Sequence, residues 1–194
     1  RVIDPETGLD AVRNIGIRGD LIAVVTDQRL DASTVIDARG LVVAPGFLDI
    51  LASPPRNDEG AVFKIFDGVT SVVSMHGGPV GTAEWYEERG RSGSFHHYGT
   101  TVGHGPLRVA AGATDPYAAA TPSQLDSMIE MARRALTEGA VGIGFGVAYV
   151  PGASRLEVLR LFELAAAEGV PCHLHIRHFG PVPPSNSRLD AVEA

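Results

Sequence analysis

The chain has 194 residues, of which 44% are hydrophobic and 20% charged, and this balance excludes a disordered or fibrous protein. The net charge is −7 and the basic residues are scattered, so we expect no nucleic-acid partner and no polybasic membrane surface. No apolar run is long enough to span a membrane, and the single cysteine, Cys172, excludes an internal disulfide. One cysteine fits a reducing compartment, and we expect a cytoplasmic protein.

Residues 1–45 predict a small antiparallel β unit. Runs rich in Val, Ile and Leu are separated by pairs typical of hairpin loops, at Gly19-Asp20 and Arg39-Gly40. Strands are expected within three stretches, 1–4, 13–25 and 34–45.

From residue 46 onwards, apolar strands alternate with helical segments. An acidic residue followed by glycine ends a helix and starts a strand three times, at Asp67-Gly68, Glu138-Gly139 and Glu168-Gly169. Strands that are apolar on both faces and alternate with helices are typical of a parallel sheet with right-handed crossovers. We expect five such strands, at about 46–51, 69–75, 97–103, 141–146 and 171–176.

Two helices have clear ends in the sequence. The first is expected over 122–138, after a capping-box spacing between Thr121 and Gln124. The second is expected to begin at Ser154 and to stop at Gly169.

This alternation predicts an α/β fold, and two architectures are compatible with it. An open doubly wound sheet usually carries a phosphate-binding glycine pattern after its first strand, and no such pattern follows Ile50. A (β/α)8 TIM-like barrel fits better, although ordinary barrels run to about 250 residues. Residues 46–194 therefore predict the first five or six β/α units of an incomplete barrel, preceded by the β unit of residues 1–45.

In a parallel barrel the reactive groups lie at the carboxyl ends of the strands, because the following loops build the open face. The residues selected by this rule are Leu51, Ser53, Met75, His76, His104, Tyr149, His173, His175 and Arg177. Four of the chain's seven histidines are in this set, which is the main reason to suspect a metal site.

The histidines have alternative interpretations. His173 and His175 are two apart on a strand, so both face the same side, either as metal or proton-transfer groups or as a hydrogen-bonded core pair. His76 precedes two glycines and is either a ligand or a packed loop histidine. Lys64, the chain's only lysine, falls in a helical stretch before the second strand, which excludes a site bridged by a carboxylated lysine.

These segments together resemble the amidohydrolase superfamily, and within it the N-acyl-D-amino-acid deacylase (D-aminoacylase-like) group. The likeness runs over essentially the whole chain, through VIDARGLVVAPGFLDI, DGVTSVV, TVGHGPLRVAAGA, EGAVGIGFGVAYVPGAS and HLHIRH in that order. It implies a hydrolase of C–N (amide) bonds that deacylates N-acyl-D-amino acids with water activated by zinc. It also implies that residues 1–45 are a β-sandwich segment.

The resemblance carries over to individual positions. It implies metal ligands at His175 and His76, and substrate contacts at Tyr149, Arg177 and His104. Arginine suits a carboxylate because its planar fork pairs bidentately. His173 is expected to orient a ligand or to serve as an alternative one.

Two departures from the family pattern reduce the implied site. The His-x-His of the first barrel strand is replaced by Leu51 and Ser53, so two ligand positions are lost. The later barrel strands, with a further histidine and an aspartate, are not in this chain. We therefore expect one Zn²⁺ per complete site, a small-molecule substrate, and a partner that is the missing C-terminal half or a complementary polypeptide. Whether the protein also forms a homo-oligomer is left open by the sequence.

Three hypotheses follow from these residues. The favoured one is an amidohydrolase with a reduced metal site. The second is a non-catalytic binding or scaffold protein, which Leu51 and Ser53 motivate. The third is a metal-free enzyme that uses His76, His104 or His175 as acid–base groups, since histidine titrates near neutrality. For these 194 residues by themselves we expect no activity.

Overall fold

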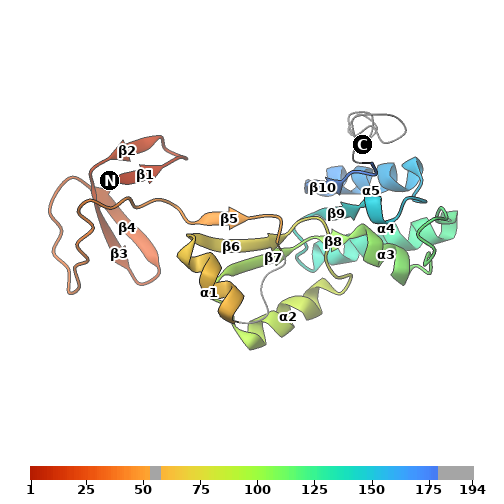
Figure 1. Ribbon diagram of the computed structural model, residues 1–194, viewed down its shortest axis with the longest axis horizontal. Helices are drawn as coiled ribbons and strands as arrows, with labels where there is room; N and C mark the ends of the chain where they lie inside the picture. Colours follow the sequence, from red (N-terminus) through yellow and green to blue (C-terminus); the bar gives the residue numbers. More distant parts are fainter. Residues whose placement is uncertain (53–57, 179–194) are drawn as a thin grey trace. The chain divides into compact units, whose positions relative to one another are not determined.

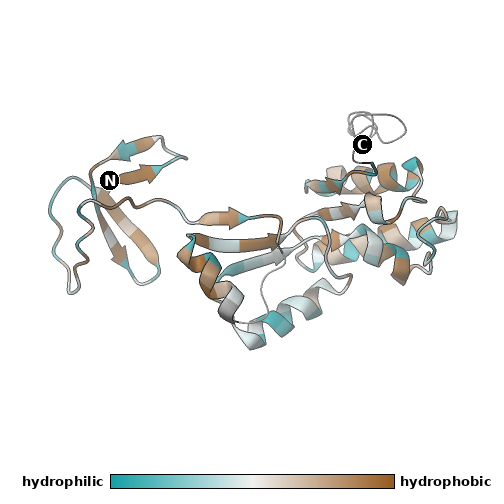
Figure 2. Ribbon diagram, in the orientation of Figure 1, coloured by the Kyte–Doolittle hydropathy of each residue, from teal (hydrophilic) through white to brown (hydrophobic). Residues whose placement is uncertain are grey.

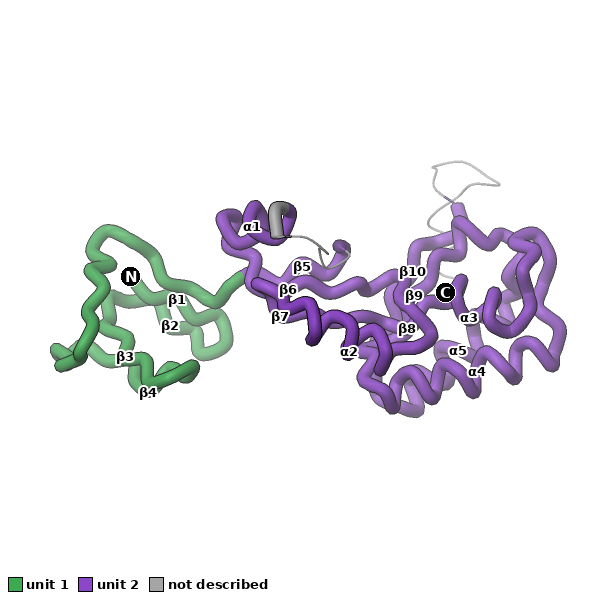
Figure 3. The backbone as a smooth tube through the Cα atoms, turned by 90° about the horizontal axis from the view of Figure 1, so that it is seen from below, with its two compact units in different colours: residues 1–46 green, residues 47–194 purple. Residues whose placement is uncertain are grey.

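The computed structural model describes residues 1–52 and 58–178. The chain divides into two compact units, residues 1–46 and residues 47–194, which Figure 3 colours separately. None of the helices in the described ranges combines the length and apolar character that a membrane span needs.

The first unit holds short antiparallel strands in two separate pairs. β1 (Val2–Asp4) pairs with β2 (Leu9–Ala11), and β3 (Asn14–Arg18) pairs with β4 (Leu21–Thr26). Gly19, between β3 and β4, has a φ of 66°, which glycine adopts without steric cost. The hairpin predicted at Gly19-Asp20 is therefore confirmed.

The prediction of a strand within residues 34–45 is wrong. These residues, all described, form only an isolated parallel bridge between Val43 and Val2, supported by a 2.9 Å hydrogen bond from Ile3 N to Val43 O. Ile36 is 85% exposed, so its side chain has no packing surface. A β-branched residue favours a strand only when neighbouring strands pack against it, which explains the miss.

The strands of the second unit are parallel. They form two three-stranded sheets, one ordered β5-β6-β7 and the other β8-β9-β10, as the ribbon of Figure 1 shows. Their bounds are Phe47–Asp49 (β5), Val69–Ser74 (β6), His97–Thr100 (β7), Val102–Gly103 (β8), Ile143–Gly146 (β9) and Cys172–His175 (β10). A doubly wound sheet reverses its strand order at a switch point. Within each of the two sheets every strand pairs with the one before or after it in the chain, so no such reversal occurs among the described strands. The described residues do not close into a barrel either.

The two sheets meet at Thr101, between β7 and β8. Its backbone N–H donates to Ser74 O at 3.0 Å, and the next N–H, of Val102, donates to Gly142 O at 3.0 Å. The predicted strand 97–103 is thus found, but it changes its hydrogen-bonding partner from β6 to β9 halfway along. The other four predicted strands are also confirmed, each somewhat shorter than expected.

The helices alternate with these strands. Their bounds are Asp58–Phe66 (α1), Thr82–Ser92 (α2), His104–Ala110 (α3), Pro122–Thr137 (α4) and Arg155–Glu168 (α5), with a 3-10 turn at Val147–Tyr149 (η1). α4 begins with the predicted capping box, in which Thr121 and Gln124 each bond the other's backbone N–H. α5 begins after Ser154 and ends at Gly169, whose φ of 67° is left-handed, so both predicted helices are confirmed.

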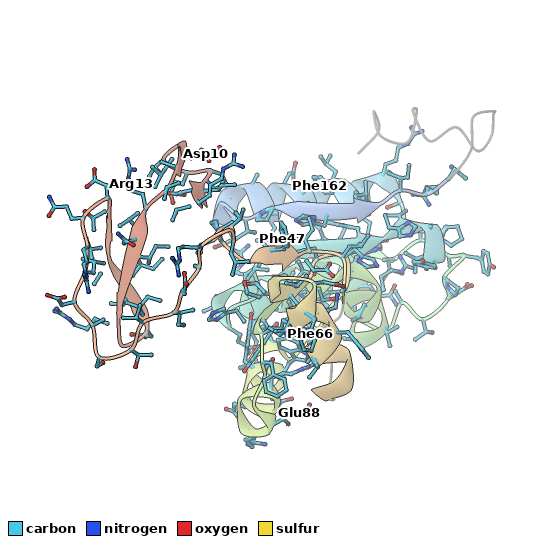
Figure 4. All side chains as sticks on the ribbon, turned by 60° about the vertical axis from the view of Figure 1, so that its left-hand side comes forward. Asp10, Arg13, Phe47, Phe66, Glu88 and Phe162 are labelled. Carbon is cyan, nitrogen blue, oxygen red and sulfur yellow. The ribbon has the colours of Figure 1, made fainter. Side chains whose placement is uncertain are left out.

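The main core of the second unit joins β8 and β9 to α4 and α5. Its fully buried members include Val102, Met128, Ile143, Phe145 and Leu161. The ring of Phe162, labelled in Figure 4, lies 5.1 Å from that of Phe145, centroid to centroid. Half-buried Cys172 packs against this cluster, and burial raises the pKa of its thiol to about 11.

The edge formed by β5 and α1 is apolar and exposed. Phe47 on β5 is 68% exposed and Phe66 on α1 is 84% exposed; Figure 4 labels both, and Figure 2 shows the hydrophobic colouring of α1. Within the described residues β5 pairs only with β6. An edge strand with exposed apolar side chains is a surface on which further chain can pair and pack.

Replacing Thr121 by alanine is expected to lower the free energy of unfolding by about 1 kcal/mol, because the first turn of α4 loses the side-chain acceptor of its capping box. Chemical denaturation measures this change. Ser127→Ala, an exposed position on the same helix, is the control and is expected to stay within about 0.5 kcal/mol of the parent. Equal losses in the two variants would contradict the role of the cap.

Candidate active site

Three predicted site residues come together at the carboxyl ends of the strands. His76 follows β6, Tyr149 ends the turn after β9, and His175 ends β10. The ring centroids of His76 and His175 are 6.0 Å apart, and those of Tyr149 and His175 are 5.2 Å apart. The Tyr149 hydroxyl lies 3.4 Å from Nε2 of His175. The described residues thus form a cluster of two imidazoles and one phenol.

The two histidines fit part of a zinc site. Nδ1 of His76 is buried and has no hydrogen-bond partner within the described residues, an arrangement that costs free energy unless something binds there. Two imidazoles about 6 Å apart can each direct one nitrogen to a common ion, as zinc requires. The described residues hold no group of three or more His, Cys, Asp or Glu side chains placed for a metal. A complete zinc site needs about four ligands, of which this pair could provide two.

The first-strand positions do not add a ligand. Leu51 lies beside the end of β6, in an isolated bridge with Ser74, and its side chain has no donor atom for a metal. Ser53 lies outside the described residues. Lys64 is on α1, where its Nζ lies 2.5 Å from Oδ2 of Asp49. This hydrogen bond lowers the pKa of the Asp49 carboxyl below its ordinary value and commits the amine to an ion pair.

Arg177 holds the loop that follows β9. Its Nη1 donates to the carbonyl of Pro151, and its Nη2 donates to the carbonyl of Ala153 at 2.8 Å. The loop carries Tyr149, so the guanidinium helps to fix the wall of the cluster. The substrate contact expected for Arg177 stays a prediction.

His173 lies on β10, opposite Gly144 of β9 in the parallel register. It shares a strand face with His175, two residues on. Its expected role, orienting a ligand or replacing one, stays a prediction.

His104 is part of a buried ion-pair network. Its side chain is fully buried, with Nε2 2.6 Å from Oε1 of Glu157 on α5. Nη1 of Arg108 lies 2.6 and 2.7 Å from the two oxygens of the same carboxylate. Burial alone would raise the pKa of Glu157, but the hydrogen bonds from His104 and Arg108 outweigh it and lower that pKa. The substrate contact expected for His104 stays a prediction.

The network extends to the loops around the cluster. Nη2 of Arg108 donates to the carbonyls of Asp115 and Ala118, at 3.1 and 2.6 Å. That loop in turn accepts a 2.8 Å hydrogen bond at Pro116 O from the backbone of Gly152, close to Tyr149. Arg108 therefore supports the tyrosine loop indirectly.

The sequence interpretation did not identify Glu157 and Arg108 as parts of this network. Arg108 follows His104 by four residues, a spacing that places both on one side of a helix. That spacing was a usable signal for the pair. Glu157 is 53 residues from His104 in the chain, and no local pattern connects them.

No family model matches the chain. The chain is similar to the N-acyl-D-glutamate deacylase of Alcaligenes xylosoxydans xylosoxydans, with 34% identity over 223 aligned positions that cover 100% of this chain and 44% of that protein. Its fold is similar to the crystal structure of a D-aminoacylase, with a TM-score of 0.77 and 28% identity over 91% of this chain and 44% of the other.

A second similar structure contains a metal. It is the N-acyl-D-glutamate deacylase of Bordetella bronchiseptica, complexed with zinc and a phosphonate inhibitor that mimics the tetrahedral intermediate. The TM-score is 0.76 and the identity 27%, over 91% of this chain and 44% of that one. The chain thus spans less than half the length of the proteins to which it is similar.

Proposed function

Because the chain belongs to the amidohydrolases that resemble D-aminoacylase and N-acyl-D-glutamate deacylase, we propose that the complete protein hydrolyses the amide bond of an N-acyl-D-amino acid. The observation that carries the proposal is the pairing of His76 with His175 at the ends of two strands, with Tyr149 beside them. A hydrolase that had lost its whole site would have no reason to keep a buried, unbonded imidazole nitrogen at this place.

In this proposal His76 and His175 hold one Zn²⁺. When bound, the ion lowers the pKa of water to about 7 and polarises the scissile carbonyl. Tyr149 is 68% exposed and borders the pair, so its hydroxyl can donate a hydrogen bond to an acyl oxygen of the substrate. Arg177 uses two of its nitrogens on backbone carbonyls, yet a guanidinium has five N–H donors and can also bind a substrate carboxylate.

The remaining ligands and the general base come, in this proposal, from a part of the protein outside this chain. Either the C-terminal half of the same protein or a complementary polypeptide supplies them. A second copy of the chain is the remaining candidate partner. The exposed apolar edge of β5 and α1 supports such a partner, because strand pairing there would bury Phe47 and its neighbours.

Metal content and turnover test the proposal on the complete protein. Elemental analysis at neutral pH is expected to find about one zinc per site, as the two histidines and the lost first-strand ligands imply. Deacylation of N-acyl-D-amino acids is expected to stop after chelation and to return when zinc is added, with the L-enantiomers as matched controls. The 194-residue chain assayed alone is expected to be inactive.

A second candidate function shares the fold without the chemistry. Leu51, where the family pattern has a metal-ligating histidine, favours a non-catalytic binding protein. Absence of both stoichiometric zinc and turnover in the complete protein would favour that candidate. Zinc-dependent hydrolysis of any N-acyl-amino acid would exclude it.

A further inference from the structure

We propose that a small group of residues, Gly78, Gly103, Gly144 and Thr101, positions His76 for zinc binding. This group is called the glycine cradle below. The inference rests on the proposed function and deepens it, because it concerns how the chain holds one ligand of that site. Three members of the cradle are glycines without a side chain, and the hydroxyl of Thr101 hydrogen-bonds backbone carbonyls.

The first observation is the close approach of two backbones. After β6 the chain crosses directly against β8 and β9. A Cβ atom at Gly144 would lie 2.6 Å from the carbonyl carbon of His76, and one at Gly103 would lie 2.8 Å from both N and O of Gly78. A Cβ atom at Gly78 would lie 1.9 Å from the carbonyl oxygen of Thr101. These neighbours are backbone atoms that cannot rotate away, so only glycine leaves space for this path of the chain.

The second observation is the set of hydrogen bonds that hold the crossing segment. Gly103 N donates to Gly78 O at 3.0 Å, on the far side of His76. On the near side, the Thr101 hydroxyl lies 3.1 Å from Ser74 O and 3.2 Å from Met75 O. The chain is thus fastened to the neighbouring strand immediately before and after His76.

The third observation concerns the His76 ring. In the proposed function Nδ1 of His76 is the nitrogen that binds the ion, so it cannot also orient the ring through a hydrogen bond. Nδ1 of His76 has no hydrogen-bond partner within the described residues. The position of the ring therefore depends on its backbone, and a binding site tolerates displacements of only about 0.5 Å. The cradle supplies that rigidity.

Adjacent glycines offer a matched test in the complete protein. Gly78→Ala places a methyl group against Thr101 O, whereas a Cβ atom at Gly77 meets nothing within 4 Å. Neither glycine has a positive φ, so the two substitutions differ in contact and not in backbone strain. Isothermal titration with Zn²⁺ is expected to show a loss of affinity of about 10- to 100-fold for Gly78→Ala, and no loss for Gly77→Ala.

A metal-free measurement separates this inference from the proposed function. The nuclear Overhauser effect between the His76 and His175 rings is expected in the parent and in Gly77→Ala, and it is expected to disappear in Gly78→Ala. If the parent binds no zinc, the proposed function fails, and the ring-to-ring signal still decides whether the cradle positions His76. If Gly78→Ala keeps the signal and the parental zinc affinity, the cradle inference is overturned.

Melting curves show whether each variant is folded. If Gly78→Ala does not fold, Thr101→Val replaces it, because valine keeps the shape of threonine and puts a methyl group in place of the hydroxyl that lies near Ser74 O and Met75 O. This variant is expected to lose zinc affinity several-fold and to weaken the ring-to-ring signal, and Thr101→Ser is expected to restore both. A Thr101→Val variant with the parental zinc affinity and an unchanged ring-to-ring signal would contradict the proposal.

Discussion

Glu157→Ala is expected to lower the free energy of unfolding by about 3–5 kcal/mol, the range found when one partner of a buried ion pair is removed. The carboxylate is fully buried and accepts hydrogen bonds from both His104 and Arg108. Without it the guanidinium of Arg108 stays buried and uncompensated. Urea denaturation, followed by the fluorescence of Trp85, the single tryptophan of these 194 residues, measures the change.

The control for this prediction lies on the same helix. Glu163 is exposed and forms a loose ion pair with Arg160 at 3.5 Å, so Glu163→Ala is expected to change the free energy of unfolding by less than about 0.5 kcal/mol. If both alanine variants lost the same free energy, the stabilisation by the buried network would be refuted.

The pH dependence of stability checks the electrostatic origin of the effect. The pKa of Glu157 is lowered in the folded protein from an ordinary value of 4.5, because His104 and Arg108 stabilise its ionised form against the cost of burial. Its contribution to stability is therefore present above pH 4.5 and is lost as the pH falls through the lowered folded-state pKa. The difference in unfolding free energy between the parent and Glu157→Gln should shrink over that acidic window.

His175→Ala in the complete protein is expected to reduce zinc affinity and kcat/KM for deacylation by more than about 100-fold. The estimate is a lower bound, because even residues that only orient a metal ligand cost about 10- to 100-fold when they are replaced. His175 is one of two imidazoles that this chain offers to the ion, so His76 alone cannot hold it. Titration with Zn²⁺ measures the zinc affinity, and steady-state kinetics measure kcat/KM.

His97→Ala is the matched control for the loss of a histidine. His97 lies on β7 and is exposed, away from the cluster of predicted ligands. We expect its variant to keep both zinc binding and turnover. A His175→Ala protein that still binds zinc with parental affinity would remove His175 from the site.

Features of the fold that depend on neighbouring residues could be predicted from the sequence. Thr121 and Gln124 bond each other within one turn, and Gly169 ends α5 through its own backbone conformation, so both helix ends were readable. Parallel strands were equally clear, because their runs are apolar on both faces. In contrast, Ile36 and its neighbours have the composition of a strand but find no partner strand among the described residues.

The candidate site also has one part that the sequence predicts and another part that it does not. The strand-end rule selected His76, Tyr149 and His175, and the structure brings these three together. The strand-end rule could not predict that Arg177 donates hydrogen bonds to backbone carbonyls or that His104 is hydrogen-bonded to buried Glu157. Both contacts join segments more than 20 residues apart. Interactions of that kind depend on the packing of the helices and not on any local pattern.

Cys172 makes the chain convenient for site-specific labelling. It is the only cysteine, and a thiol with a pKa of about 11 is ionised in only about one molecule in 10⁴ at neutral pH. Maleimide and haloacetamide reagents attack the thiolate, so they would react slowly with the native residue. A cysteine introduced at exposed Glu130 on α4 would carry a dye or spin label selectively, and the native thiol would not need to be removed first.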